Sequence, residues 1–174
     1  MSQHPDTVSI RLLGRSRDGV TVRYDDSVTS HAAGHFRDTP GLLAAATDAI
    51  SRASIAVAPR VITLDVGYIA GLSDLVPIQP GDETFYAKRA HRDVYTVFNR
   101  TRAPWPCSLV TFVLEAADSR GDRLLRTAWV GPAAPCFPGD PNESPESRPF
   151  WRAHALAWGA HDIQPGTETA ICPW

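Results

Sequence analysis

The sequence predicts an α+β fold: a mostly antiparallel β-sheet, with an N-terminal helix packed on it and a short C-terminal helix. Three observations lead to this prediction. Alternating apolar residues flank turn signals, one segment repeats its apolar residues at helical spacing, and a second helical segment follows a proline-rich stretch. Of the 174 residues, 43% are hydrophobic and 21% are charged, which is typical of a folded protein. The length predicts a single domain over residues 1–174.

The first predicted elements are a hairpin and a helix. Apolar and polar residues alternate through residues 8–24 on both sides of Asp18-Gly19, a dipeptide that favours tight β-turns. Thr39 and Pro40 then match a helix N-cap and the first helical position. The predicted helix continues to Arg52. Its apolar face consists of Leu42, Leu43, Ala46 and Ile50.

Strands are predicted through the middle of the chain. Residues 56–68 are rich in Val and Ile, and residues 85–98 contain one or two further strands. The clearest pair is 107–116 with 123–130, because the turn residues 118–122 separate them. These patterns predict antiparallel neighbours.

The last third of the chain begins with a proline-rich segment. Residues 131–149 contain six prolines, together with Gly, Asn and Ser, which predicts an ordered loop. Residues 150–158 then predict a short helix that carries Trp151, His154 and Trp158 on one face. The tryptophans are expected to anchor the packing of this helix.

Composition excludes several classes of function. A net charge of −2 argues against a protein that coats nucleic acid. No run of about 18 apolar residues is present, so we expect no membrane span, and residues 1–6 lack the pattern of a signal peptide. Cys107, Cys136 and Cys172 are too widely spaced for a disulfide framework or a zinc motif. We therefore expect a reduced, cytoplasmic protein.

A cationic block is the strongest functional signal. Lys88, Arg89, Arg92, Arg100 and Arg102 place five positive charges close together, and the segment 86–102 contains a single Asp. Guanidinium groups pair bidentately with phosphate, sulfate and carboxylate oxygens. The segment therefore predicts an anion site in which Arg89, Arg92 and Arg100 hold the anionic group and neutralise the charge that grows in a transition state. Its predicted substrate-binding residues are Tyr86, Tyr95, Thr96 and Arg100. The alternative is a solvated edge strand, whose charges deter aggregation.

The following strands carry further candidates. We expect Ser108, Thr111, Arg126 and Thr127 to meet the cationic block across a sheet. The alternative is that each has only a structural role in its strand, since Thr is a good strand former. Arg126 is the best of these candidates, because its neighbours in the sequence are apolar and a partly buried Arg requires a partner or a ligand. Trp105 lies between two prolines and is expected to stack on a base or to close a pocket.

His31 and His35 are the candidates for acid–base chemistry. Their i, i+4 spacing would suit two metal ligands on a helix, but Ala32 stands where a metalloprotease has Glu. We therefore expect no metal and no cofactor. An imidazole titrates near neutral pH and exchanges protons with nucleophiles and leaving groups. His35 is the preferred proton shuttle and His31 the reserve, and the alternative is that both are solvent-facing loop residues.

These residues occur in an order that resembles a family of small uncharacterised bacterial proteins. The matching features are His31/His35, Tyr86-Ala87-x-Arg89-x-x-Arg92, Ser108-x-x-Thr111, the segment 126–131, Phe150-Trp151 with His154-Ala155-Leu156, and Cys172-Pro173-Trp174. More distantly, the arrangement is similar to metal-free ribonuclease toxins of the barnase, EndoU, colicin and RelE-like fold. This resemblance implies that His35 is the general acid and base, that Arg89 and Arg92 clamp a phosphate, and that Thr111 and Arg126 support them.

Three classes of function follow. The first is metal-free cleavage of RNA, in which the arginines stabilise the charge of the transition state. The second is a small-molecule enzyme of a biosynthetic pathway, in which the same arginines hold a phosphate, sulfate or carboxylate. The third is a non-catalytic protein that binds a protein partner, or a second copy of itself, through its Trp-rich C-terminus.

Overall fold

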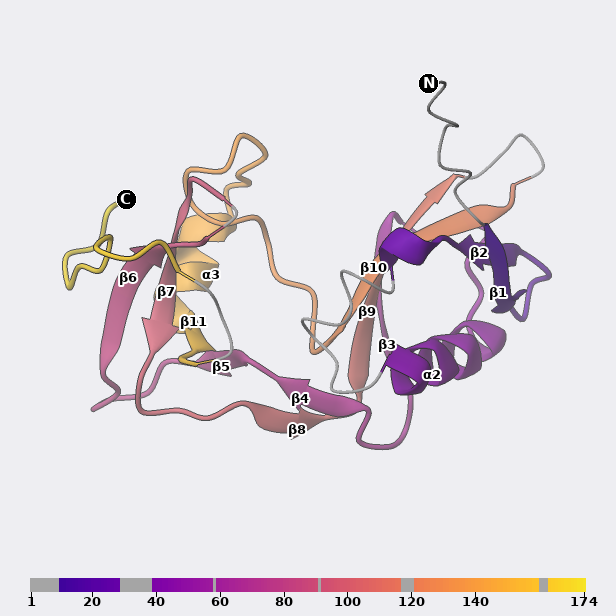
Figure 1. Cartoon of the computed structure of the whole chain (residues 1–174), viewed down its shortest axis with the longest axis horizontal. Coiled ribbons are helices and arrows are strands. Elements are labelled where there is room, and N and C mark those ends of the chain that lie inside the picture. The colour runs from indigo at the N-terminus through magenta and orange to yellow at the C-terminus, as the bar shows by residue number, and fades with distance from the viewer. Residues whose placement is uncertain (1–9, 29–38, 58, 91, 117–120, 160–162) are drawn as a thin grey trace, which may run out of the picture. The chain divides into compact units, whose positions relative to one another are not determined.

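The structure is a computed structural model that describes residues 10–28, 39–57, 59–90, 92–116, 121–159 and 163–174. The predicted α+β class with mostly antiparallel sheets is confirmed (Figure 1). The chain divides into two compact units, each with its own hydrophobic core. The first unit comprises Met1–Gly71 and Cys107–Ala133, and the second comprises Leu72–Pro106 and Ala134–Trp174. That the chain forms a single domain stays a prediction.

The first unit is built on a five-stranded sheet. Its strand order is β1 (Arg11–Arg15), β2 (Thr21–Tyr24), β10 (Arg123–Val130), β9 (Leu109–Ala116) and β3 (Val61–Asp65). All neighbouring strands are antiparallel except β2 and β10, which are parallel. The predicted opening hairpin and the predicted pair β9–β10 are therefore confirmed.

Helix α2 (Thr39–Arg52) of the first unit ends at the predicted residue and begins one residue before the predicted first helical position. Ala46 and Ile50 on its apolar face are fully buried in the core of this unit. From β9, the alternate residues Val110, Phe112 and Leu114 are buried in the same core, as the period of two in their sequence predicts. One face of the sheet is thus covered by apolar packing.

The second unit contains a four-stranded sheet and a short helix, α3 (Ser147–Ala153). The strand order is β5 (Leu75–Pro77), β11 (His154–Ala157), β7 (Tyr95–Asn99) and β6 (Thr84–Lys88). β6 and β7 form an antiparallel hairpin, whereas β11 and β7 are parallel. A separate two-stranded sheet pairs β4 (Gly71–Ser73) with β8 (Trp105–Cys107), where the chain passes between the units.

The predicted helix over residues 150–158 is wrong in its second half. The helix ends at Ala153, and His154–Ala157 forms β11. Ala155, Leu156 and Ala157 are buried between β5 and β7, whose backbones supply their hydrogen-bonding partners. This pairing overrides the helix propensity of Ala and Leu. Trp151, His154 and Trp158 consequently do not share one helix face.

The C-terminal segment runs along the outer edge of β6. The backbone N–H of Tyr86 donates to the carbonyl of Thr169 at 2.8 Å, and the N–H of Thr169 donates back to Tyr86 at 2.9 Å. A second bridge joins Arg89 to Ile163. The segment covers an otherwise open sheet edge and brings Trp174 against Tyr86, with ring centroids 5.0 Å apart.

The structure also bears on the membrane and disulfide predictions. A membrane crossing needs about 20 apolar helical residues, and no helix in the described ranges meets this requirement. All three cysteines are free: Cys107 is buried, whereas Cys136 and Cys172 are exposed. A cytoplasmic location stays a prediction.

Candidate functional site

The predicted site residues are distributed over both units. Ser108, Thr111, Arg126 and Thr127 belong to the first unit, and the candidates from Tyr86 to Trp105 belong to the second. β9 and β10 lie in the five-stranded sheet, while β6 and β7 lie in the four-stranded one, so the expected meeting across one sheet is wrong. His31 and His35 lie outside the described residues. Their cooperation with the arginines stays a prediction.

Thr111 is a fully buried residue of β9. Its hydroxyl donates to the carbonyl of Gly131 at 2.7 Å and lies 2.8 Å from the hydroxyl of Thr63. The Thr63 hydroxyl in turn accepts the N–H of Ala133 at 3.2 Å. These bonds hold the start of the proline-rich loop against the sheet, and they support a packing role for Thr111.

Ser108 and Thr127 occupy half-buried positions at the same sheet. The backbone N–H of Gly67 and, second, the Ser108 hydroxyl hold the pKa of Asp65 below its ordinary value. Thr127 lies opposite Val113 in the ladder. Both positions are accounted for by local structure.

Arg126 lies at a register shift in β10, between the paired positions Leu125 and Thr127. Its Nε donates to Glu115 at 2.7 Å, and an Nη atom lies 3.5 Å from a carboxylate oxygen of Asp25. The hydrogen bond from Arg126 is the largest cause of the lowered pKa of Glu115. The partner that the sequence predicts for Arg126 is therefore a pair of carboxylates from its own unit.

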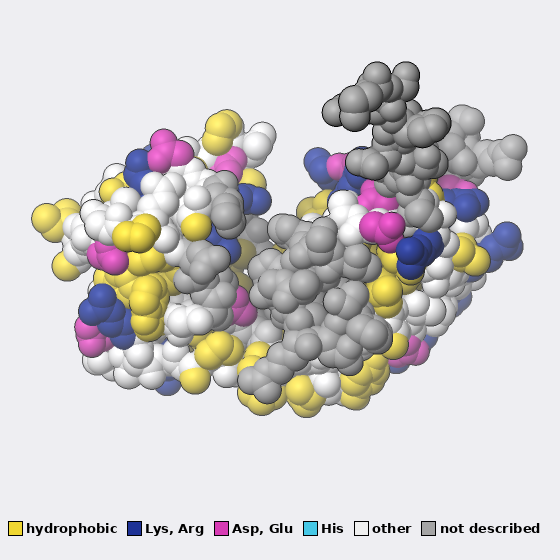
Figure 2. Space-filling view, viewed as in Figure 1, with side chains coloured by type: hydrophobic (Ala, Val, Ile, Leu, Met, Phe, Trp, Pro, Cys, Tyr) yellow, Lys and Arg dark blue, Asp and Glu magenta, His cyan; other side chains and the backbone are white. Residues whose placement is uncertain are grey.

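Most of the cationic block is balanced by acidic groups. Among the residues that the structure describes, three of its cations form ion pairs: Lys88 with Asp93 at 2.5 Å, Arg100 with Glu83 at 3.1 Å, and Arg102 with Asp82 at 2.8 Å. On the face of the second unit seen in Figure 2, Lys and Arg side chains lie next to Asp and Glu side chains. The block is thus a set of local ion pairs more than a continuous positive surface.

Antiparallel pairing explains two of these ion pairs. Asp82 and Glu83 precede β6, and Arg100 and Arg102 follow β7. Because Thr84 lies opposite Asn99, the residues that precede Thr84 lie close to the residues that follow Asn99. Both acidic residues lie just before the segment 86–102, so the charge of that segment alone does not include them.

Arg89 and Arg92 are the other two arginines of the cationic block. The guanidinium of Arg89 lies over the ring of Phe137, 5.5 Å from its centroid. The side chain of Arg92 is exposed and has no ion pair among the described residues. Arg92 stays a candidate for contact with an anion.

The remaining predicted binding residues to be placed are Trp105, Thr96 and Tyr86. The Trp105 indole donates to the carbonyl of Leu75 at 2.9 Å. Thr96 is fully buried, and its hydroxyl has no hydrogen-bond partner among the described residues. Burial and, second, a hydrogen bond with Cys172 raise the pKa of Tyr86.

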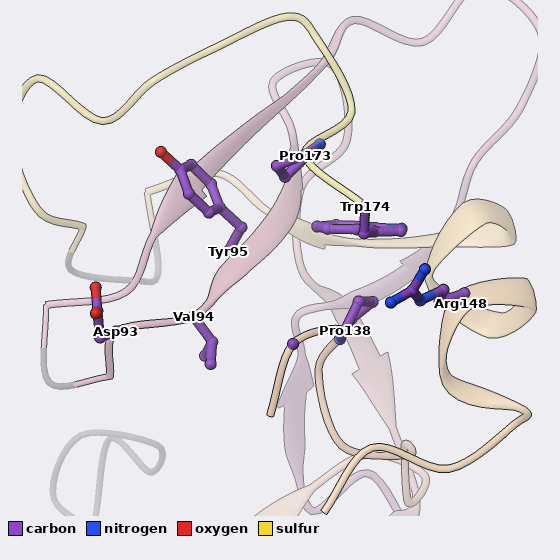
Figure 3. Close-up of a pocket in the computed structure, with 8 residues that line it drawn as sticks. Asp93, Val94, Tyr95, Pro138, Arg148, Pro173 and Trp174 are labelled. Atoms are coloured by element: carbon purple, nitrogen blue, oxygen red, sulfur yellow. The ribbon is translucent and has the colours of Figure 1, made fainter. Parts of the chain in front are cut away.

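A pocket of about 210 Å³ opens in the second unit (Figure 3). Its walls come from the start of β7, the proline-rich loop, α3 and the C-terminal segment. The lining residues are Asp93, Val94, Tyr95, Pro138, Gly139, Arg148, Pro173 and Trp174. Tyr95 is a predicted binding residue, Arg92 directly precedes Asp93, and the Arg89 guanidinium contacts Phe137 beside Pro138.

Arg148 is the cationic side chain in the lining of this pocket, and it lies outside the cationic block 86–102. Its Nε donates to Glu143 at 2.7 Å, and Glu143 also accepts the N–H of Gly139 at 2.8 Å. The hydrogen bond with Glu143 is the largest cause of the raised pKa of Arg148. Within the described residues, its two Nη atoms have no hydrogen-bond partner. Glu143 therefore fixes the guanidinium while leaving its outer donors available.

The aromatic walls are also held in place. Tyr86 packs edge-to-face on Trp174 at an interplanar angle of 87°. Lys88 lies over the ring of Tyr95, 5.6 Å from the centroid, and pairs with Asp93. Since Asp93 is engaged in this way, Arg148 is the side chain of the lining best suited to bind a charged group. The arrangement combines two fixed aromatic rings with one cation.

Sequence reasoning missed Arg148 and the role of Trp174 in this pocket. Arg148 lies in the proline-rich segment, which is predicted only as a loop, and Trp174 is far from Tyr95 in the sequence. The one available signal is the spacing of Glu143 and Arg148 beside Pro138-Gly139. This pattern does not by itself indicate a pocket.

Comparison of the chain with models of protein families, with curated proteins and with solved structures finds no match. The resemblance to ribonuclease toxins therefore stays a prediction.

Proposed function

We propose that this protein binds a small molecule carrying a phosphate, sulfate or carboxylate group, and that Arg148 holds this group in the pocket of the second unit. The observation that carries the proposal is the geometry of Arg148. Its Nε is fixed by Glu143, and its Nη atoms have no partner among the described residues. Two parallel N–H donors of this kind match the oxygens of an oxyanion.

The size of the pocket favours a small ligand. A volume of about 210 Å³ corresponds to roughly seven water molecules at about 30 Å³ each. Ligand pockets for drug-sized molecules begin at about 300 Å³. The ion pairs of Lys88, Arg100 and Arg102 further reduce the charge available to a long polyanion. A metabolite-sized anion is the ligand that fits these features best.

Replacing Arg148 with Gln is expected to weaken the binding of inorganic phosphate and sulfate by at least about tenfold, because a hydrogen bond to a charged group contributes about 1.5–3 kcal/mol. Binding would be measured by titration, following the indole N–H signals in NMR spectra. Arg100→Gln is the matched control, since Arg100 pairs with Glu83 and lies over Phe85 outside the pocket lining. Equal binding by the wild type and Arg148→Gln would contradict the proposal.

Cleavage of RNA is the second candidate function. The feature that favours it is Arg92, which is exposed and without an ion pair among the described residues, three positions after Arg89. Arg92 would contact a phosphodiester, and His35 would exchange the proton of the 2′-hydroxyl.

For this second candidate, we expect the purified protein to cleave RNA in the presence of a chelator, and His35→Ala to lower the rate by about 10²–10⁴-fold. The measurement is cleavage of a labelled single-stranded RNA. Arg11→Ala is a suitable control, because Arg11 lies on the edge strand β1 of the first unit and pairs with Asp26. Absence of cleavage by the wild type would exclude this candidate.

A further inference from the structure

We infer that the anion bound in the second unit is aromatic: a flat ring stacks on Trp174 while its anionic substituent meets Arg148. This inference rests on the proposed binding of a small anion and adds the class of the molecule that carries the charge.

The walls of the pocket are composed mainly of apolar and aromatic residues. Five of the eight lining residues are Val94, Tyr95, Pro138, Pro173 and Trp174, which present apolar or aromatic surface. A bare inorganic anion leaves such surface in water, whereas a ring covers it. Aromatic pairs prefer offset-stacked or edge-to-face geometry, which flat walls of this kind permit.

The orientation of Trp174 favours stacking of a ring on its indole. Figure 3 shows the indole edge-on, with Arg148 and Pro138 on the same side of its plane. A ring lying against this face of the indole would have Pro138 beyond it and the guanidinium at its border. The ring of Trp174 is held by Tyr86, and its Nε1 is buried without a hydrogen-bond partner among the described residues. The indole therefore offers its π face rather than its N–H donor.

The volume of the pocket is suited to a ligand with one ring. The pocket volume of about 210 Å³ accommodates one six-membered ring with a single anionic substituent, given roughly 30 Å³ for each displaced water. Two fused rings with a sugar, as in a nucleotide, would extend beyond this space. The ligand class is therefore a monocyclic aromatic phosphate, sulfate or carboxylate.

The test compares phenyl phosphate with cyclohexyl phosphate, which carry the same charge and number of non-hydrogen atoms. We expect the wild type to bind phenyl phosphate roughly two- to tenfold more tightly, the range that aromatic pairing supports. Trp174→Leu is expected to remove this preference, and Trp174→Phe, which keeps a ring, to retain it. Inorganic phosphate and Arg148→Gln are measured in parallel, by NMR titration of the full chain.

The outcomes separate this inference from the proposal beneath it. Equal binding of the two organic phosphates, with both weakened by Arg148→Gln, would overturn the aromatic ligand and leave anion binding intact. Binding that Arg148→Gln does not weaken would overturn both. Phosphotyrosine with blocked ends distinguishes the source of the ring: tighter binding than phenyl phosphate indicates a ring carried by a protein, and weaker binding indicates a free molecule.

Discussion

Replacing Trp151 with Ala is expected to destabilise the second unit by about 3–5 kcal/mol, as large-to-small substitutions of buried aromatic residues do. Trp151 is 2% exposed and packs on Phe137 at 4.7 Å and Phe150 at 5.3 Å between ring centroids. Its indole N–H also lies 3.2 Å from the carbonyl oxygens of Pro135 and Cys136. The measurement is equilibrium unfolding in urea, followed by circular dichroism.

Trp158→Ala is the matched control, because the Trp158 side chain is 42% exposed. It contacts Phe85 and Phe98 edge-to-face, so we expect a smaller loss from its removal. An equal loss in both variants would show that Trp151 is not the anchor that its burial indicates. Because Trp151 holds the carbonyls just before Pro138, its removal should also weaken anion binding in the pocket.

Local patterns in the sequence were sufficient for most of the elements. The hairpin around Gly19 follows from alternation and from a residue that accepts a φ of 85°. α2 follows from helical spacing after Thr39 and Pro40. In each case, residues close together in the chain determine both the element and its buried face.

Elements that depend on distant partners were predicted less well. β11 is a strand because β5 and β7 lie on either side of it, and neither partner is close in the sequence. Its residues Ala155, Leu156 and Ala157 suit a helix equally well by propensity. Period alone does not separate a short buried strand from a helical turn.

The site shows the same limit. Tyr95 was predicted from its place in the cationic block, and it lines the pocket. Arg148 and Trp174 reach the pocket only because α3 and the C-terminal segment pack around β6 and β7. The sequence overestimates the net positive charge of the cationic block. Glu83 precedes β6, and the antiparallel pairing of β6 with β7 brings it to Arg100.

Replacing Phe112 with Ala is the corresponding test of the first unit. Phe112 is fully buried in the core beneath α2, so a loss of about 3–5 kcal/mol is expected. In a unit of fewer than about 100 residues, such a loss lowers the melting temperature by more than about 10 °C. Val61→Ala on the edge strand β3 is the control, because Val61 is 41% exposed.

Comparison of the Phe112 and Trp151 variants also tests the prediction of a single domain. The two residues lie in separate cores, which contain no common residue. If the chain unfolds as one cooperative domain, both substitutions lower the same calorimetric transition. If the units unfold separately, Phe112→Ala shifts one transition and Trp151→Ala the other. In the second case, ligands of the pocket stabilise only the transition that Trp151→Ala shifts, because binding stabilises only the unit that forms the site.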